Sequence, residues 1–289
     1  MHFRELEGHS GCRIILAEDN GRVFVRKVSR STGYNARLEA QARKQSAFRS
    51  EYLSAPAVYS AGFTSEGLYY FDMEYISGIT LAEYMKTIQA CSIRSIVRAL
   101  MLSMNTGTAE TSGDPQQVFS RKIRSLEEEL AGSGSPAVSE AFAVLSGHKW
   151  NKFTPGFCHG DLTLENIIVK DGRLYLIDFL DSFYDCWIMD AATLLQDVYA
   201  MWSYRRQVQD INTVIHLMIF RDIMTDIIAE TAGDDVVVEV YYALLLKLLR
   251  IYPYTDDKPT LDFLDAKTAT VTGMIARTHE DADNSLCRR

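Results

Sequence analysis

Short β-rich runs dominate the first quarter of the chain. Residues 13–17 and 21–28 are two such runs, separated by an Asn-Gly pair that is a strong signal for a tight hairpin. Residues 35–50 are rich in helix formers, and residues 58–61 and 68–75 again have strand character. This part of the chain is therefore predicted to combine strands with one helix.

The pattern turns helical in the second quarter. Thr80 and Glu83 form a capping box, which predicts a helix over residues 80–104. The Asp-Pro and Ser-Pro pairs at 114–115 and 135–136 predict two further helix starts, because proline favours the first helical position after a good N-cap.

One more hairpin is embedded in this helical part. Residues 166–179 contain two apolar runs around an Asp-Gly pair, and the pattern beyond Trp187 is helical almost to the end. The chain is therefore predicted to be an α+β protein with two lobes. The smaller, β-rich lobe covers residues 1–76, and the larger, mainly helical lobe covers residues 77–289.

Composition narrows the class of protein. A chain of 289 residues with 47% hydrophobic residues can bury the cores of two lobes. Its net charge of -8 disfavours nucleic acid as a partner, because an acidic chain repels phosphate backbones. The five cysteines are scattered, and no leader or membrane-spanning stretch is visible, so we expect a cytoplasmic protein.

One segment carries most of the candidate chemistry. His159-Gly160-Asp161 precedes the embedded hairpin, Asn166 follows five residues later, and Asp178 stands at the end of the second run. The two strands of a hairpin return the chain to its starting point, so these side chains are expected to meet. Phosphoryl transfer needs a carboxylate that accepts the hydroxyl proton and oxygen ligands for magnesium beside the phosphates.

The HGDxxxxN and IDF motifs resemble those of the aminoglycoside phosphotransferase and choline kinase superfamily, a relative of the protein kinases. The resemblance implies a kinase-like fold, with ATP and Mg²⁺ as cofactors and a hydroxyl as phosphate acceptor. It implies that Asp161 is the catalytic base and that Asn166 and Asp178 bind the magnesium. His159 is then expected to hold the loop, and Asp190 to bond the loop backbone or to favour its own helix N-terminus.

Nucleotide contacts are expected in the first lobe. Strand alternation places Lys27 on the same face as Val25 and Arg26 on the opposite face. By the resemblance, Lys27 binds the α- and β-phosphates, and Glu39 is its partner as the only acid of the following helix. The alternatives are a solvated strand lysine and a surface pair between Glu39 and Arg43.

The connection between the lobes, FDMEYISGITL, resembles a kinase hinge. This implies that Met73 lines the back of the adenine pocket and that backbone groups of Glu74 and Ile76 bind the adenine edge. Gly8 and Gly11 stand where a phosphate-covering loop is expected, although their spacing matches no nucleotide-binding fingerprint. A Rossmann enzyme is disfavoured because no glycine fingerprint follows a strand.

The acceptor is expected to be a sugar, an amino sugar or an amino alcohol. Eleven residues separate Asp178 from Asp190, which is too few for a regulated peptide-docking loop and disfavours a protein kinase. A nucleotide-binding pseudokinase is disfavoured because the expected catalytic, metal-binding and phosphate-binding residues are all present. Asp181 and Asp185 are candidates for hydrogen bonds with the acceptor. Nearby aromatic residues that could stack on it are Phe183, Tyr184, Trp187, Tyr199, Trp202 and Tyr204.

Overall fold

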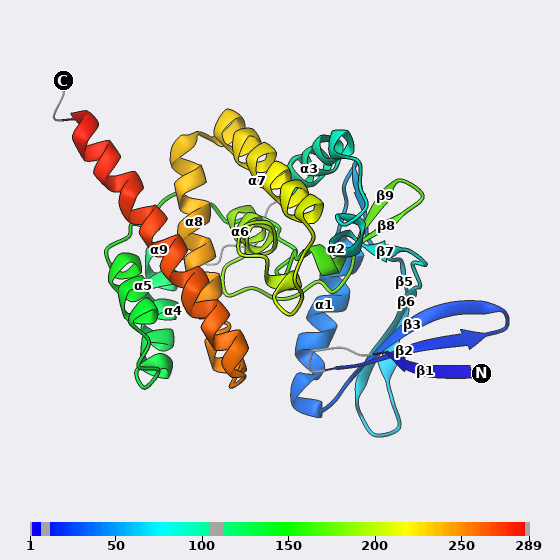
Figure 1. The fold of residues 1–289 in the computed structure, drawn as a ribbon. Coiled ribbons are helices and arrows are strands. Elements are labelled where there is room, and N and C mark those ends of the chain that lie inside the picture. The colour runs from blue at the N-terminus through cyan, green and yellow to red at the C-terminus, as the bar shows by residue number, and fades with distance from the viewer. Residues whose placement is uncertain (1, 7–11, 105–112, 287–289) are drawn as a thin grey trace. The chain divides into compact units, whose positions relative to one another are not determined.

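Figure 1 shows the fold of the chain in the computed structural model. The structure describes residues 2–6, 12–104 and 113–286. The glycine loop expected around Gly8 and Gly11 lies outside these described residues. The chain is an α+β protein, as predicted, with its larger sheet in the N-terminal part and mainly helices in the C-terminal part.

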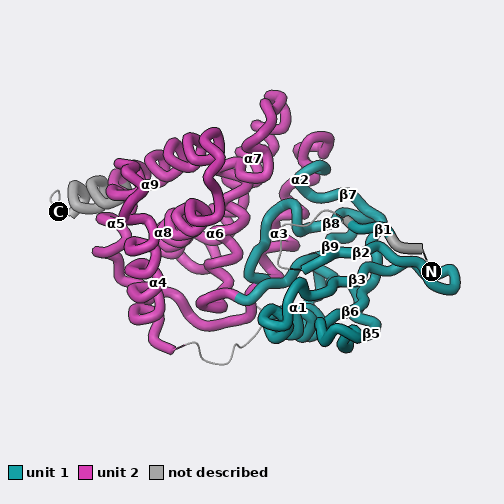
Figure 2. The backbone as a smooth tube through the Cα atoms, turned by 90° about the horizontal axis from the view of Figure 1, so that it is seen from below, with its two compact units in different colours: residues 1–84, 159–181 teal, residues 85–158, 182–289 magenta. Residues whose placement is uncertain are grey.

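The chain divides into two compact units (Figure 2). Unit 1 contains residues 1–84 and 159–181, and unit 2 contains residues 85–158 and 182–289. The first unit thus includes the motif segment, which the boundary expected after residue 76 had placed in the second lobe. The division of nucleotide binding and acceptor binding between two lobes stays a prediction.

Unit 1 is built on two sheets. The larger is antiparallel with strand order β1-β2-β3-β6-β5, and the smaller has the order β4-β9-β8-β7 with β4 and β9 parallel. The strands are β1 (His2–Leu6), β2 (Cys12–Asp19), β3 (Arg22–Ser29), β4 (Leu53–Ser54), β5 (Val58–Phe63), β6 (Tyr69–Glu74), β7 (Ile79–Thr80), β8 (Ile167–Lys170) and β9 (Arg173–Leu176).

Two tight hairpins turn at the pairs that predicted them. Asn20 and Gly21 join β2 to β3 with φ of 50° and 78°, and Asp171 and Gly172 join β8 to β9 with φ of 49° and 74°. Positive φ at both central positions matches the right-handed twist of the flanking strands. Glycine adopts this conformation without a steric cost, which is why it occupies the second position.

Helix α1 (Asn35–Ala47) packs on one face of the larger sheet. Its buried residues Leu38 and Ala42 lie in one core cluster with Val25 of β3 and Phe71 of β6. Full burial of Leu38 contributes roughly 1.5–3 kcal/mol to this packing. Because Lys27 follows Val25 by two residues on the same strand, it lies on the face that α1 covers.

Unit 2 is helical, and both proline-marked starts are confirmed. Asp114 and Ser135 cap their helices, accepting hydrogen bonds from the amides of Gln117 and Val138. None of the helices among the described residues is long and apolar enough to cross a membrane. The helices are α3 (Ala90–Met104), α4 (Pro115–Leu130), α5 (Pro136–Ser146), α6 (Trp187–Val198), α7 (Ile211–Ala232), α8 (Asp234–Leu249) and α9 (Lys258–Leu286), after the short α2 (Leu81–Tyr84) of unit 1.

The helix expected over residues 80–104 is broken into α2 and α3. Its start is as predicted, because Thr80 Oγ1 accepts from the Glu83 amide at 3.2 Å. The side chain of Met85 is fully buried just after α2, and its carbonyl accepts from a ring nitrogen of His216 at 2.8 Å. Tertiary contacts therefore satisfy a backbone group that a continuous helix would have used internally.

Candidate active site

The loop that carries Asp161 closes on itself through Asn166. The side-chain nitrogen of Asn166 donates to the Asp161 main-chain carbonyl at 2.9 Å and to its Oδ2 at 3.0 Å. Asn166 is the last residue of a short 3-10 helix, Leu164–Asn166, which turns the chain back toward Asp161. Both amide hydrogens of Asn166 are used, so its oxygen Oδ1 is the atom left to face a cation.

His159 supports this loop as a neutral ring. Its Nε2 lies 2.8 Å from the carbonyl of Ile177, and its Nδ1 lies 3.3 Å from the amide nitrogen of Asp161. A carbonyl only accepts, so Nε2 carries the proton and Nδ1 accepts. Burial lowers the pKa of His159 to about 3, so the ring is neutral at physiological pH. These contacts are those of a supporting residue.

Asp178 lies two residues beyond β9, whereas the sequence placed it at the end of that strand. It adopts a left-handed backbone conformation with φ of 62°, which costs about 1–2 kcal/mol for a residue with a side chain. Hydrogen bonds of its neighbours hold it there. The Ile177 amide donates to the Asn166 carbonyl at 2.9 Å, and the Leu180 amide donates to the His159 carbonyl at 2.9 Å.

Gly160 is required by the close approach of this same segment. It has a φ of 94°, and a Cβ at this position would lie 2.2 Å from the carbonyl oxygen of Leu180. Any other residue would be strained and would also displace Leu180. The middle residue of the His-Gly-Asp triplet therefore brings Asp161 and the Asp178 segment together.

Lys27 reaches the same place from β3. Its Nζ lies 2.5 Å from Oδ1 of Asp178, and the residue is only 3% exposed, which excludes a solvated strand lysine. Arg26 points to the opposite face, where it pairs with Asp72 at 2.6 Å and 2.8 Å. The alternation expected along this strand is thus present, and unit 1 alone brings the phosphate, metal and base candidates into one region.

Glu39 does not pair with Lys27 in this structure. Its carboxylate accepts from Arg43 at 2.9 Å across one helical turn, while Lys27 pairs with Asp178. The distances therefore correspond to the surface pair that was the alternative for Glu39. A contribution of Glu39 to nucleotide binding stays a prediction.

The residues expected to form the hinge lie at and beyond the end of β6. Met73 is buried in the core beneath α1, and Gln45 Nε2 lies 3.4 Å from its sulfur. The Glu74 amide donates to the Ala57 carbonyl at 2.9 Å, so this amide is already engaged. The Ile76 carbonyl accepts from a nearby amide at 3.0 Å, whereas its own amide has no intramolecular acceptor among the described residues.

Gly78 follows the hinge segment and fits tightly against β8. A Cβ at this position would lie 2.4 Å from the carbonyl oxygen of Val169. This close approach lets β7 pair with β8 in the smaller sheet, where Ile79 lies opposite Val169. The absence of a side chain at Gly78 therefore allows the end of the hinge segment to pack against the motif hairpin.

The two acids proposed to bind the acceptor are both already engaged. Asp181 belongs to unit 1 and accepts from Arg37 at 2.7 Å, in an ion pair that is about half exposed. Asp185 belongs to unit 2 and accepts from the thiol of Cys158, with 3.0 Å between sulfur and oxygen. Their binding of an acceptor stays a prediction.

Several of the aromatic candidates belong to the core of unit 2. Tyr184 is fully buried and its hydroxyl donates to the Phe153 carbonyl at 2.7 Å, and Tyr204 is 4% exposed. Phe183 packs edge-on against a buried phenylalanine of α4, with ring centroids 5.1 Å apart. Asp190 is buried in the first turn of α6, and its role toward the loop stays a prediction.

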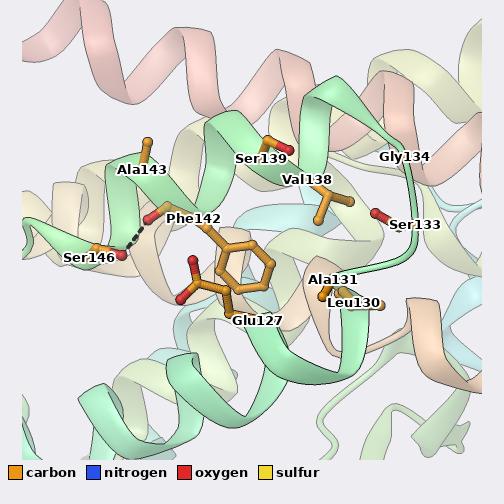
Figure 3. A pocket seen from close by; sticks show the side chains of 10 residues that line it. All are labelled: Glu127, Leu130, Ala131, Ser133, Gly134, Val138, Ser139, Phe142, Ala143 and Ser146. Carbon is orange, nitrogen blue, oxygen red and sulfur yellow. Dashed lines mark hydrogen bonds between the residues drawn. The ribbon is translucent and has the colours of Figure 1, made fainter.

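A separate hollow of about 460 Å³ lies within unit 2, between α4 and α5 (Figure 3). Its lining combines apolar side chains such as Val138 and Phe142 with serines and Glu127. It contains none of the residues expected to bind nucleotide, metal or acceptor. The region around Asp161 and Asp178 is therefore the candidate site for the chemistry.

The sequence interpretation did not single out Lys44, which contacts this region. Lys44 of α1 donates from Nζ to the Leu180 carbonyl at 2.8 Å. Its position in the sequence resembles that of any exposed helix lysine, and the adjacent Arg43 is indeed 72% exposed. Periodicity offers a weak signal, because Lys44 lies three residues after the buried Gln41.

Comparison with protein families identifies the chain. A profile of the phosphotransferase enzyme family matches residues 6–214, well over half of the sequence. The chain belongs to the phosphotransferase enzyme family. The enzyme class predicted from the motifs, a phosphotransferase, is thereby confirmed. A comparison with curated protein sequences returned no match.

Solved structures show the same fold as this phosphotransferase. A thermostable mutant of aminoglycoside phosphotransferase APH(4)-Ia, in complex with AMP-PNP and hygromycin B, has a TM-score of 0.65 at 16% identity, covering 96% of this chain and 94% of that chain. A putative fructosamine-3-kinase from Haemophilus somnus has a TM-score of 0.60 at 15% identity, with coverages of 95% and 91%. Amicoumacin kinase, in complex with AMP-PNP, Ca²⁺ and Ami, has a TM-score of 0.56 at 16% identity, with coverages of 94% and 88%. At these identities the likeness establishes the kinase-like fold alone.

Proposed function

We propose that this phosphotransferase transfers the γ-phosphate of ATP to a hydroxyl group of a small molecule. The observation that carries the proposal is the arrangement in unit 1, where Lys27 pairs with Asp178 at 2.5 Å and Asn166 holds the carboxylate of Asp161 at 3.0 Å. A cation for phosphates, a carboxylate for the acceptor and two metal-binding oxygens are the parts that phosphoryl transfer requires.

Each side chain has a defined part in the proposed reaction. The carboxylate of Asp161 orients the acceptor hydroxyl and takes its proton, while the hydroxyl oxygen forms a bond to the γ-phosphorus. The bond from that phosphorus to the β–γ bridging oxygen breaks, and ADP leaves. Lys27 stabilises the charge on the phosphates, and the hydrogen bonds from Asn166 fix the orientation of Asp161.

The residues fit a divalent cation. Asn166 presents Oδ1 because its nitrogen is committed to Asp161, and Asp178 offers a carboxylate, so the donor set consists of oxygens as Mg²⁺ prefers. Asn166 and Asp178 would hold the ion. When bound, it would supply positive charge that offsets the negative charge on the phosphates.

The nucleotide contacts proposed from the hinge have partial support. The Ile76 amide has no intramolecular acceptor among the described residues, so it is available to the adenine edge. Met73, buried beneath α1, is proposed to close the back of the adenine pocket, and Glu74 to contribute a backbone group. Glu39 would contribute to nucleotide binding only if its carboxylate left Arg43 and paired with Lys27.

The acceptor proposed is a sugar, an amino sugar or an amino alcohol. The supporting observation is the short connection between Asp178 and α6, which starts at Trp187 and leaves no room for a long peptide-docking segment. Asp181 and Asp185 are proposed to bond the acceptor's hydroxyl or ammonium groups, which would have to compete with Arg37 and Cys158.

A panel assay tests this function. We expect the chain, with ATP and magnesium, to phosphorylate at least one member of a set of sugars, amino sugars and amino alcohols. Asp161→Asn should lower turnover by on the order of 100- to 10,000-fold with nearly unchanged nucleotide affinity. Asp171→Asn is the matched control, because it makes the same change in the exposed hairpin turn of the same motif.

Three outcomes would contradict the proposal. Full turnover in Asp161→Asn would contradict the catalytic assignment. Phosphorylation confined to a protein substrate would favour a protein kinase. Nucleotide binding without any transfer would favour a pseudokinase.

A further inference from the structure

Helix α1 contacts the segment after Asp178 through Lys44. The ammonium group of Lys44 donates to the main-chain carbonyl of Leu180 at 2.8 Å, and the side chain is partly buried. A charged donor gives a stronger hydrogen bond than a neutral one, and partial burial limits competition from water.

The carbonyl group that accepts this hydrogen bond lies very close to the backbone of the motif. The Leu180 carbonyl oxygen is so close to Gly160 that a Cβ there would be 2.2 Å away. The Leu180 amide meanwhile donates to the His159 carbonyl at 2.9 Å. Both backbone polar groups of Leu180 are thus bonded, and its carbonyl contacts the residue that precedes Asp161.

Asp178 depends on such support on both sides. Its φ of 62° is unfavourable for a residue with a side chain, so the surrounding bonds must maintain it. Ile177, before it, is held by Asn166 and His159, and Leu180, after it, is held by His159 and Lys44. Three of these four bonds come from the motif segment itself, and the fourth comes from α1.

A second pair between α1 and this segment is less well placed to support it. Arg37 bonds Asp181 at 2.7 Å, but the two side chains are 49% and 53% exposed. Water and salt compete strongly with an exposed pair, so it contributes little. The partly buried Lys44 is therefore the effective link from α1.

We propose that Lys44 is a positioning residue for phosphoryl transfer: by holding the Leu180 carbonyl against Gly160, it sets Asp178 relative to Asp161. This inference rests on the proposed function. In this inference Lys44 is the residue that links α1 to the site. The sequence analysis had expected a pair between Glu39 and Lys27 to make this link.

The test compares Lys44→Met, Lys44→Arg and Arg43→Met in the full chain. The probe is magnesium-dependent hydrolysis of ATP without an acceptor. We expect Lys44→Met to lower kcat about 10- to 100-fold and to raise the magnesium concentration for half-maximal activity, as loss of a residue supporting a metal ligand does. The KM for ATP should change less than about threefold, because Lys44 acts on the metal and base geometry and not on nucleotide binding.

Two controls separate positioning from a general effect on folding. Lys44→Arg keeps a charged donor and should recover most of the activity, and Arg43→Met removes a neighbouring charge that is 72% exposed and should behave as wild type. Gly160→Ala displaces the same carbonyl from the other side and should lower kcat as well.

Several results would overturn the inference. One is a Lys44→Met chain with wild-type kcat and magnesium dependence. Another is equal loss in Lys44→Met and Lys44→Arg accompanied by a lower melting temperature, which would indicate a structural role only. A wild-type chain that neither binds nor hydrolyses magnesium-ATP would contradict the proposed function itself, whereas active wild type with equally active Lys44→Met contradicts this inference alone.

Discussion

Arg26 and Lys27 are neighbours on β3 that carry the same charge on opposite faces of the sheet. Arg26 is bonded within the sheet: it makes two hydrogen bonds to Asp72 of β6, which also accepts from Ser60 of β5 at 2.8 Å. The guanidinium also lies 4.3 Å from the ring centre of Tyr70. All members of this network lie on three adjacent strands of the larger sheet.

Within the described part of the chain, the ammonium group of Lys27 pairs with one side chain, and that partner comes from far along the sequence. Asp178 lies 151 residues later, in a strained backbone conformation and in a loop with further polar residues. The difference teaches that a local, fully satisfied ion pair is a stabilising feature. A pair that joins distant segments, and whose acid is also proposed to bind the metal ion, is the proposed functional feature.

The largest expected difference is in turnover. Lys27→Ala should lower kcat on the order of 100-fold, because it removes a charge that stabilises the phosphates in the transition state. Arg26→Ala, in the same strand, should leave kcat of the folded enzyme nearly unchanged. Steady-state kinetics on the two variants is the measurement, and equal losses would contradict the assignment of the two faces.

Stability should show the opposite order. Arg26→Met leaves Asp72 mostly buried without its cation and should lower the free energy of unfolding by about 1–3 kcal/mol, less than for a fully buried pair because Arg26 is 27% exposed. Lys27→Met should cost less, since Asp178 is 25% exposed and can be hydrated. Urea unfolding of both variants tests this, and a larger loss in Lys27→Met would reverse the comparison.

The contribution of His159, which supports the segment of Asp178, to the stability of the fold should depend on pH. The pKa of His159 is lowered to about 3 from 6.5, so below pH 6.5 the unfolded chain binds a proton that the folded chain does not. The stability contributed by the neutral ring is complete above pH 6.5 and is lost as the pH falls. Between pH 7 and pH 5, protonation of His159 in the unfolded chain should lower the free energy of unfolding by about 2 kcal/mol.

The control for this pH effect is His159→Gln, which keeps a donor but does not titrate. We expect it to be less stable than wild type at pH 7 and to lose less stability on going to pH 5. Urea titrations at the two pH values provide the comparison. Parallel losses in both proteins would show that other groups cause the pH dependence.

The smallest effect is expected for Arg37. Its pair with Asp181 joins the same segments as Lys44 does, but it is about half exposed, so Arg37→Ala should change the free energy of unfolding by less than about 1 kcal/mol. Thermal denaturation measures this change. A loss as large as that of Arg26→Met would mean that exposed contacts of α1 also anchor the segment after Asp178.

Local signals predicted much of the fold. The Asn-Gly and Asp-Gly turns lie where their pairs predicted them, and the caps at Asp114 and Ser135 bond the amides three residues later. Each of these features depends on residues a few positions apart, so the sequence contains all the necessary information. The opposite orientation of Arg26 and Lys27 follows equally from strand geometry.

The five-residue spacing between Asp161 and Asn166 predicted part of the site, and tertiary contacts decided the rest. It predicted that Asp161 and Asn166 would meet, and the structure shows a hydrogen bond of 3.0 Å between their side chains. It did not predict that Asp178 would leave the strand, because the left-handed conformation depends on bonds to His159 and Asn166.

By itself, then, the sequence determined six strands (β2, β3, β5, β6, β8 and β9), the starts of α1, α2, α4 and α5, the strand faces and a candidate set of residues for phosphoryl transfer. Tertiary structure alone decided the partners: Lys27 pairs with Asp178 and not Glu39, Lys44 reaches Leu180, and the helix after Thr80 breaks at Met85. The physical reason is range. Turns, caps and alternation are set by the backbone within a few residues, whereas the partner of a buried charge depends on which distant segments pack beside it.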